Sequence, residues 1–444
     1  MVKIISFIIL FFAYQNAFAN MIITNFNEKI NFTDYGREVE TSIKIRISLE
    51  SNNQYYKEWR YIFDKRLKVN ILEAKVIGKK YKTSFNNNEL IFQFDNAVNG
   101  DLFEFRFKYR IYNENTIKYI RDEFVSIPYF ASGANGNIVV NIPNNLAVYS
   151  LNRKFTQNGS TYTWRGTVPK NGFSDFFFLT LKKAKWQVEI LSEISSNKNI
   201  SSFDMIIPLY FKNGNNKIEK YIVEANYNNN FAKIIESQDS IITTFRNADN
   251  SLFQVKVDAI LSNDYDNKIW IKLNPQNYLK IDRSLSNYLQ NMIYQIRQNT
   301  KEDELLYVIL AQWVNKNVEY DINYVGKDLT TKEILEKKKG VCIHYAQLYN
   351  DLLRSVGIPS VIVSGISYNT TNNKFENHAW NLVYTNGDWR AIDPTWGLYS
   401  GILPVSHIFL YFENRPVINY TTYSNSSIHF KSNIQKNINF INEY

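Results

Sequence analysis

The chain has 444 residues, of which 45% are hydrophobic and 21% are charged, and its formal net charge is +9. These values are ordinary for a globular protein of two or three domains, and they exclude a disordered or collagen-like chain. The positive charges are scattered and accompany no nucleic-acid-binding motif, so they predict a solvated surface and no nucleic-acid partner.

The first 19 residues have the features of a cleaved signal peptide. Lys3 precedes a short apolar run at residues 4–12, and Ala17-Phe18-Ala19 is a small-x-small cleavage site. That run is too short to cross a hydrocarbon layer of about 30 Å, and no later segment is long and apolar enough. We therefore expect a mature, periplasmic or secreted protein that starts at Asn20 and has no integral membrane segment. An uncleaved N-terminal anchor or a buried strand is the alternative.

Residues 20–185 predict a β-sandwich-like domain. Apolar and polar side chains alternate at residues 43–49 and again at 103–111, which is the period of a strand with one buried and one wet face. Turn signals rich in Asn and Gly separate several such strands. A second β-rich stretch at residues 186–274 is either a separate domain or a continuation of the first.

The pattern changes to helices after Pro275. Apolar residues recur at helical spacing over residues 285–296 and over residues 306–314. Thr330 and Glu333 have the spacing of a capping box, which predicts the start of a short helix that Gly340 would end.

A further helix is expected from Cys342 to Val356, and three strands are expected after it, at residues 361–363, 378–384 and 389–392. The Asn-Gly pair at 386–387 predicts a tight hairpin between the last two strands. Helices followed by antiparallel strands indicate an α+β domain over residues 275–412. Residues 413–444 are polar and are expected to form a loosely ordered tail.

Cys342 is the only cysteine of the chain. A lone cysteine in an exported protein cannot form an internal disulfide, so it is either a small buried hydrophobe or a reactive group. At a helix N-terminus its thiolate would be stabilised by the backbone dipole and by unpaired N–H groups. The same N–H groups could hold an oxyanion.

The predicted hairpin allows a geometric test of the neighbours of Cys342. With a two-residue loop at 386–387, Trp380 lies opposite Asp393, and His378 shares their face of the sheet. Asp393 could then orient the imidazole of His378, which could take the proton of Cys342. A register shifted by one residue would place His378 and Asp393 on opposite faces.

Each of these residues also has a purely structural interpretation. Cys342 could be buried filler, His378 a strand histidine with a structural hydrogen bond, and Asp393 a turn former before Pro394. His344 is expected to be a packing or surface residue, and His407 and His429 to be bystanders. Four histidines without paired spacing predict no zinc site. No phosphate-binding loop and no full calcium loop is present, so no metal or cofactor is expected.

Four motifs together resemble the transglutaminase-like (transglutaminase core) superfamily: Gly340-Val341-Cys342, Leu352-Leu353-Arg354-Ser355-Val356-Gly357-Ile358-Pro359, His378-Ala379-Trp380 and Asp393-Pro394-Thr395-Trp396. The resemblance covers residues 275–400. It implies a papain-like α+β fold and a catalytic triad of Cys342, His378 and Asp393. It also implies an upstream aromatic residue that helps to hold the oxyanion, for which Tyr320 is the candidate. Bacterial members often carry β-rich N-terminal regions.

The residues and the resemblance together predict an exported thiol enzyme of acyl transfer. Cys342 would form a thioester from a protein or peptide amide, with a peptidoglycan stem peptide as one candidate substrate. Water would resolve the thioester in a peptidase or amidase, and an amine would resolve it in a transglutaminase. The alternative is a catalytically inactive scaffold whose β-rich half binds envelope protein or glycan. The sequence predicts no particular oligomeric state.

Overall fold

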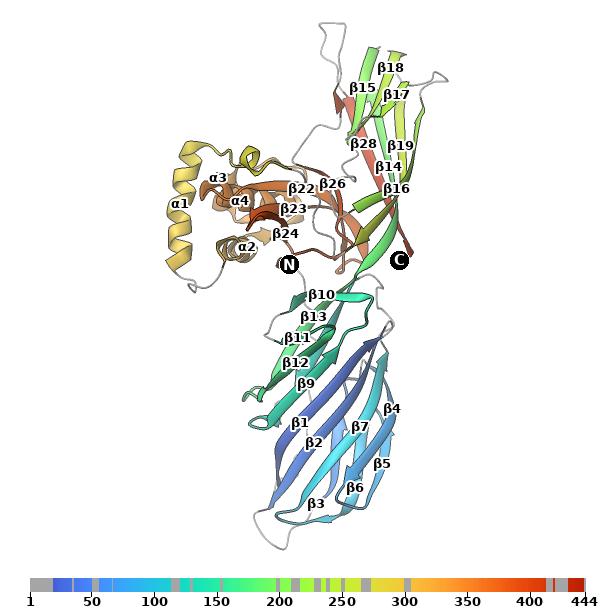
Figure 1. Cartoon of the computed structure of the whole chain (residues 1–444), viewed down its shortest axis with the longest axis vertical. Coiled ribbons are helices and arrows are strands. Elements are labelled where there is room, and N and C mark those ends of the chain that lie inside the picture. The colour runs from blue at the N-terminus through green and yellow to red at the C-terminus, as the bar shows by residue number, and fades with distance from the viewer. Residues whose placement is uncertain are drawn as a thin grey trace. The chain divides into compact units, whose positions relative to one another are not determined.

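The computed structural model describes residues 19–33, 36–49, 56–65, 67–112, 120–127, 131–151, 155–196, 200–208, 216–226, 233–236, 240–248, 252–264, 273–298, 305–412, 418–419 and 430–442. The chain divides into two compact units, with the division between Thr180 and Leu181 (Figure 1). The expected signal peptide lies outside the described residues except for Ala19. Within the described part, no helix is long and apolar enough to cross a membrane.

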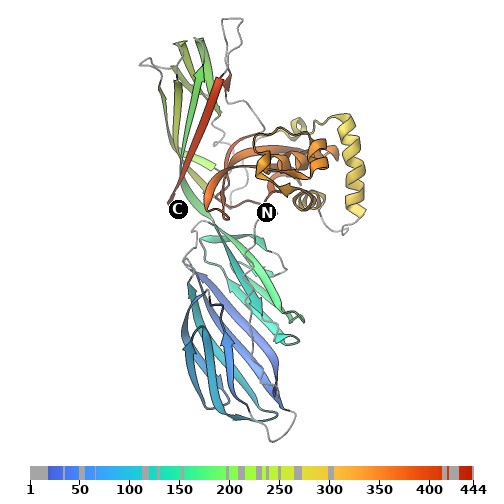
Figure 2. The same cartoon turned by 180° about the vertical axis from the view of Figure 1, so that it is seen from behind.

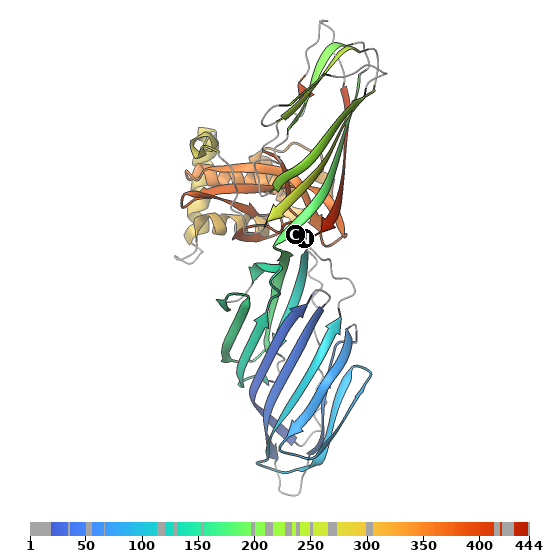
Figure 3. The ribbon, with the colours of Figure 1, turned by 45° about the vertical axis from the view of Figure 1, so that its right-hand side comes forward.

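The first unit has one large sheet and two small ones. The large sheet has seven strands in the order β11-β12-β9-β1-β2-β7-β4. The small sheets have three strands each, in the orders β3-β6-β5 and β10-β13-β8. Figure 3 shows the large sheet in front of the second layer. The strands are β1 (Ala19–Thr33), β2 (Gly36–Leu49), β3 (Tyr56–Ile62), β4 (Lys68–Ile77), β5 (Tyr81–Asn86), β6 (Glu89–Ala97), β7 (Leu102–Tyr112), β8 (Ile120–Ile127), β9 (Asn135–Asn141), β10 (Leu146–Leu151), β11 (Thr156–Asn158), β12 (Thr161–Thr167) and β13 (Phe173–Leu181).

Aromatic residues at alternate positions of β7 pack the seven-stranded sheet against the small sheet β3-β6-β5. On β7, Phe103, Phe105 and Phe107 are buried, whereas the residues between them point outward. Trp59 of β3 stacks on Phe105, with ring centroids 4.2 Å apart. Burial of each such ring stabilises the fold by roughly 2–3 kcal/mol. The expected β-sandwich-like N-terminal region is confirmed.

Glu28, Glu123 and Asp175 are buried carboxyl groups of this sandwich, and Glu28 has a raised pKa. Glu28 of β1 is 5% exposed and accepts hydrogen bonds from the hydroxyls of Thr41 (3.2 Å) and Tyr109 (3.4 Å). Burial raises the pKa of Glu28 to about 7, although the charge of Arg37 and the two hydroxyls act to lower it. The stability of this unit is therefore linked to pH.

The second unit begins with two four-stranded sheets, ordered β16-β19-β14-β28 and β17-β18-β15-β27. The strands are β14 (Lys183–Ser196), β15 (Ile200–Pro208), β16 (Asn216–Asn226), β17 (Lys233–Glu236), β18 (Ser240–Ala248), β19 (Leu252–Asp264), β27 (Ile418–Asn419) and β28 (Phe430–Asn442). Figure 2 shows β28, in red, running beside the green strands. The loosely ordered tail predicted after residue 412 is therefore wrong for residues 430–442, because they pair with β14 along its length.

The helices and the third sheet of this unit form an α+β arrangement, as predicted. The sheet is ordered β25-β24-β23-β22-β26, and α4 packs against β22 and β23. The elements are η3 (Pro275–Tyr278), α1 (Arg283–Gln298), α2 (Leu306–Asn317), β20 (Glu319–Tyr320), η4 (Ile322–Tyr324), α3 (Thr331–Lys337), β21 (Lys339–Gly340), α4 (Cys342–Ser355), β22 (Ser360–Asn369), β23 (Lys374–Thr385), β24 (Asp388–Asp393), β25 (Leu398–Gly401) and β26 (Ile408–Phe412).

Local sequence signals explain several element boundaries. Thr330 and Glu333 form the expected capping box at the start of α3. This helix ends at Lys337, earlier than the predicted end at Gly340, because Lys338 adopts the left-handed conformation (φ 51°). At the β23–β24 hairpin, Asn386 and Gly387 both have positive φ, 53° and 83°, as a type I′ turn requires.

Candidate active site

Cys342 is the first residue of α4 and is partly exposed. The segment before it is held by a short parallel pairing, in which Tyr320 of β20 lies opposite Gly340 of β21. The N–H of Asp321 donates to the carbonyl of Gly340 at 2.9 Å. These contacts hold the backbone that leads into α4 in place. The thiol of Cys342 lies at a helix N-terminus, as predicted.

His344 holds the same turn from inside the fold. It is 1% exposed, and its Nδ1 accepts the N–H of Val341 at 2.9 Å. Its Nε2 lies 2.8 Å from the carbonyl of Lys327, which can only accept, so Nε2 carries the proton. A Cβ on Gly340 would lie 2.6 Å from the Cβ of His344. The expected packing role of His344 is thus a specific one, since it shapes the turn before Cys342.

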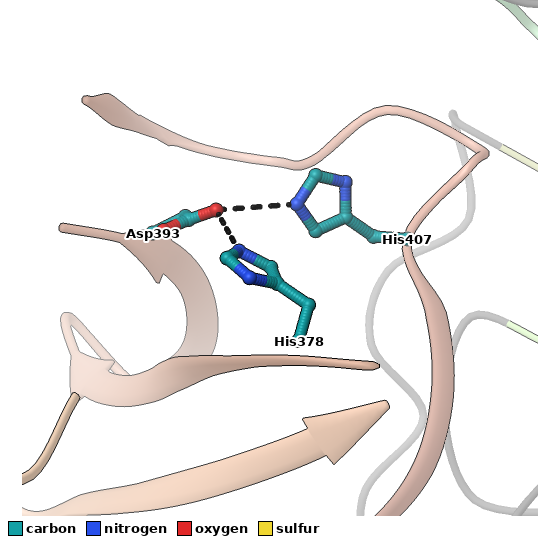
Figure 4. A group of neighbouring side chains, drawn as sticks. All are labelled: His378, Asp393 and His407. Carbon is teal, nitrogen blue, oxygen red and sulfur yellow. Dashed lines mark hydrogen bonds and ion pairs between the residues drawn. The ribbon is translucent and has the colours of Figure 1, made fainter. Parts of the chain in front are cut away.

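The β23–β24 hairpin has the predicted register. Asn381 pairs with Ile392 and Thr385 pairs with Asp388, so the next position of the ladder sets Trp380 opposite Asp393. His378 and Asp393 consequently share one face of the sheet. Nε2 of His378 lies 2.7 Å from Oδ2 of Asp393, as Figure 4 shows.

Asp393 lies at the centre of a hydrogen-bond network and is fully buried. Its Oδ1 accepts the backbone N–H groups of Thr395 (2.9 Å) and Trp396 (3.1 Å). Burial by itself raises the pKa of this carboxyl group, but His378 and His407 hold that pKa well below its usual range. Asp393 therefore stays ionised over the ordinary pH range.

The imidazole of His378 is placed between a carboxylate and a thiol. Burial lowers the pKa of His378, but the charge and hydrogen bond of Asp393 and the hydrogen bond with Cys342 raise that pKa to about 10. In Figure 4 the second ring nitrogen points away from the carboxylate. Cys342, His378 and Asp393 thus form a continuous series of polar contacts.

Aromatic rings surround this imidazole. Trp396 is stacked on His378 with the ring centroids 4.1 Å apart and an angle of 18° between the planes. Trp380 lies 6.0 Å from the same ring. These rings keep water from the bond between His378 and Asp393, and an aromatic face also stabilises a neighbouring cation.

His407 is a site residue that the sequence did not reveal. It is buried, and its Nε2 lies 3.3 Å from Oδ2 of Asp393 (Figure 4). Burial lowers the pKa of His407, so the ring is a neutral donor to the carboxylate. The expected bystander role of His407 is therefore wrong. No sequence signal could have identified this residue, because it comes from a loop before β26 that has neither a periodic pattern nor a motif.

The same three side chains could in principle hold a metal ion. The ligand atoms of His378, Asp393 and His407 lie within 4.8 Å of one another. Their spacing in the sequence resembles no metal-binding motif, so the sequence does not predict this group. The hydrogen bonds of Asp393 to both imidazoles account for the cluster without an ion.

Tyr320 of β20 pairs with Gly340, two residues before Cys342. Its side chain is 39% exposed, and its ring centroid is 6.3 Å from that of Tyr345 on α4. Burial raises the pKa of Tyr320 to about 12, and the charges of Cys342, Glu376 and Asp393 contribute to this shift. The phenol therefore remains a hydrogen-bond donor at neutral pH.

Residues 290–394 match the transglutaminase-like superfamily. This segment is a transglutaminase-like core. The core contains Cys342, His378 and Tyr320, and it reaches Asp393 at its end. The kyphoscoliosis peptidase of Mus musculus is 34% identical over 114 residues, which are 23% of this chain and 17% of that protein. The Homo sapiens counterpart has the same identity and coverage. The chain thus spans only a small part of the curated relatives that it matches.

Two solved structures match parts of this chain. The first, described as a candidate cysteine protease from Cytophaga hutchinsonii, has a TM-score of 0.42 and 14% identity, and the match covers 59% of this chain and 94% of that chain. The periplasmic domain of TgpA from Pseudomonas aeruginosa has a TM-score of 0.25 and 15% identity, with 49% of this chain and 88% of that chain covered.

Proposed function

We propose that this protein is an exported thiol enzyme of acyl transfer whose nucleophile is Cys342. The observation that supports this most strongly is the series of contacts from the thiol at the start of α4 through His378 to the buried carboxylate of Asp393. This is the arrangement of an activated nucleophile, a general base and a group that orients the base.

In the proposed first step, the sulfur of Cys342, whose proton is already held by His378, bonds to the carbonyl carbon of a peptide or glutamine amide. The negative oxygen is held by backbone N–H groups at the start of α4 and by the hydroxyl of Tyr320. The C–N bond then breaks, and the imidazolium of His378 gives its proton to the departing amine. Asp393 keeps the imidazole in one tautomer and stabilises its charge.

In the second step, water or an amine attacks the thioester. His378 accepts a proton from this nucleophile, and the C–S bond breaks to release the sulfur as a thiolate beside the imidazolium. Water gives hydrolysis and an amine gives an isopeptide bond, with the same three side chains in both cases. The peptidase name of the mammalian relatives favours hydrolysis. A protein, a peptide or a peptidoglycan stem peptide is the proposed class of substrate.

The decisive experiment compares the full-length protein with Cys342→Ala over a panel of peptides and glutamine-containing proteins. Ammonia release, peptide cleavage and incorporation of a labelled amine are measured in parallel. We expect turnover that is lost in Cys342→Ala. Cleavage without amine incorporation identifies a hydrolase, and the reverse identifies a cross-linking enzyme. Turnover that survives in Cys342→Ala would refute the proposed nucleophile.

A non-catalytic scaffold is the second candidate, and one observation favours it. The outward face of the seven-stranded sheet carries a groove of about 730 Å³, lined by charged residues that include Lys29, Lys44 and Arg106. Such a groove could bind envelope protein or glycan. Slow alkylation of Cys342 at neutral pH, together with binding of a glycan array to this unit, would support the scaffold over the enzyme.

A further inference from the structure

Glu376 lies close to the proposed catalytic residues on the same face of β23. It precedes His378 by two residues, and side chains two apart on a strand point the same way, about 7 Å from each other. The pairing with β22 is regular here, with Ser367 opposite Glu376 and Gly365 opposite His378. The Glu376 side chain therefore follows His378 along the strand, toward the β22–β23 hairpin.

The carboxylate of Glu376 is held in place by neutral donors. Nδ2 of Asn369 donates to one oxygen at 2.9 Å, and Nδ2 of Asn372 donates to the other. Within the described part of the chain, no lysine or arginine lies at ion-pair distance from Glu376. Lys374 shares its face of β23 but forms no ion pair with it. The negative charge is thus oriented but uncompensated.

This charge is also close to the thiol, because His378, its neighbour on the same face of the strand, is hydrogen-bonded to Cys342. Burial raises the pKa of Tyr320, and the charges of both Cys342 and Glu376 act in the same direction. The nearest cation before the helix, Lys339, is engaged with Glu319 (3.5 Å) and Asp321 (3.8 Å). A cation on a bound substrate would therefore meet Glu376 as its free counter-charge.

We propose that Glu376 forms a subsite for a positively charged group of the substrate, an ammonium or a guanidinium, beside Cys342. This inference builds on the proposed acyl transfer. Two sources supply such a group: a basic residue next to the amide that is attacked, or the ammonium end of a diamine or lysine acceptor. Both would be oriented by the same carboxylate, whose two amide contacts fix its position before binding.

A thiol-labelling experiment tests the subsite without any substrate. Cys342 is the only cysteine, so methanethiosulfonates form a mixed disulfide at this position alone and release methanesulfinate. Rates are compared for a trimethylammonium, a neutral methyl and an anionic sulfonate reagent. We expect Glu376→Gln to lower the cation-to-neutral rate ratio roughly threefold to tenfold and to raise the anion-to-neutral ratio. High salt should reduce the ratio in the wild type.

The matched control is Glu336→Gln, which removes one charge from the exposed side of α3. This control should keep the wild-type ratios, and Glu376→Asp should restore part of the cation preference. Equal ratios in wild type and Glu376→Gln, with unchanged thermal unfolding, would overturn the subsite.

Turnover then separates the two sources of the cation. Peptides with lysine or norleucine beside the amide form one pair, and cadaverine and pentylamine form the other. We expect Glu376→Gln to reduce kcat/KM roughly tenfold for the cationic member of one pair and to leave the neutral member unchanged. Absence of any turnover that depends on Cys342 would refute the proposed function, whereas the labelling ratios would still decide on the subsite.

Discussion

The indole of Trp396 is stacked on the imidazole of His378, with ring centroids 4.1 Å apart. The backbone N–H of Trp396 also donates to Oδ1 of Asp393 at 3.1 Å, while Oδ2 of the same carboxylate bonds to His378. One carboxylate therefore positions both the imidazole and the ring that covers it. The aromatic cover and the hydrogen bond act in the same direction, because each favours the protonated imidazole.

We predict that Trp396→Leu lowers the pKa of His378 and reduces kcat/KM roughly tenfold, since an aromatic face contributes about 1–2 kcal/mol to a desolvated cation. Trp396→Phe keeps a ring and should have a smaller effect. An NMR titration of the His378 ring measures the pKa directly. An unchanged titration in Trp396→Leu would show that the stacking is only structural.

The pair of His378 and Asp393 should make stability depend on pH in a defined window. The pKa of His378 rises from 6.5 to about 10 on folding. The contribution of His378 to the free energy of unfolding is therefore complete below pH 6.5 and is lost as the pH rises through 10. The pKa of Asp393 falls below its ordinary 3.8, so its contribution is present above that pH and is lost on acidification.

The stabilising effect of the pair is therefore greatest between about pH 4 and pH 6.5. We expect the difference in unfolding free energy between wild type and His378→Gln to shrink steadily from pH 6 to pH 10, as measured by urea unfolding. A difference that grows over this range would contradict the assigned direction of the pKa shift.

Gly340→Ala should disturb the turn before Cys342. The added Cβ would lie 2.6 Å from the Cβ of His344, which must move and release the N–H of Val341. We expect a loss of about 1–3 kcal/mol of unfolding free energy and a slower reaction of Cys342 with iodoacetamide. The double variant with His344→Ala should be less destabilised than the sum of the two single variants, because the clash is then absent. Simple additivity would argue against this contact.

Glu28 should make the N-terminal unit more stable in mild acid. Its pKa rises from 4.5 to about 7 on folding, so stability is highest below pH 4.5 and falls as the pH rises through 7. Glu28→Gln should remove up to about 3 kcal/mol of the difference between pH 5 and pH 8. Urea unfolding followed by fluorescence measures the effect, with Glu40→Gln on the exposed face of β2 as the control. An unaltered pH difference in Glu28→Gln would contradict the raised pKa.

The local signals of the sequence were sufficient for much of the candidate site. The Asn-Gly turn at 386–387 fixes the register of its hairpin, and that register alone brings His378 and Asp393 to one face. The capping box at Thr330 and Glu333 marks a helix start, because a polar side chain must satisfy N–H groups there. Such features depend on a few neighbouring residues and can be read without tertiary contacts.

Features that depend on distant residues were missed. His407 reaches Asp393 from a loop without a repeat pattern, so its role is visible only in three dimensions. The same holds for β28, whose polar sequence resembles a tail but which pairs through its backbone with β14. Backbone pairing of this kind requires little from side-chain composition.

The pairing of β28 has a consequence for the catalytic sheet. Trp186 of β14 is fully buried and contacts both Phe440 of β28 and Phe375 of β23, each with its ring centroid 5.3 Å from that of Trp186. Phe375 directly precedes Glu376 on the strand that carries His378. A chain shortened at residue 412 would leave β14 with an open edge that is prone to aggregation, and Trp186 would lose its contact with Phe440. Through Trp186, β28 therefore supports β23, the strand that carries His378.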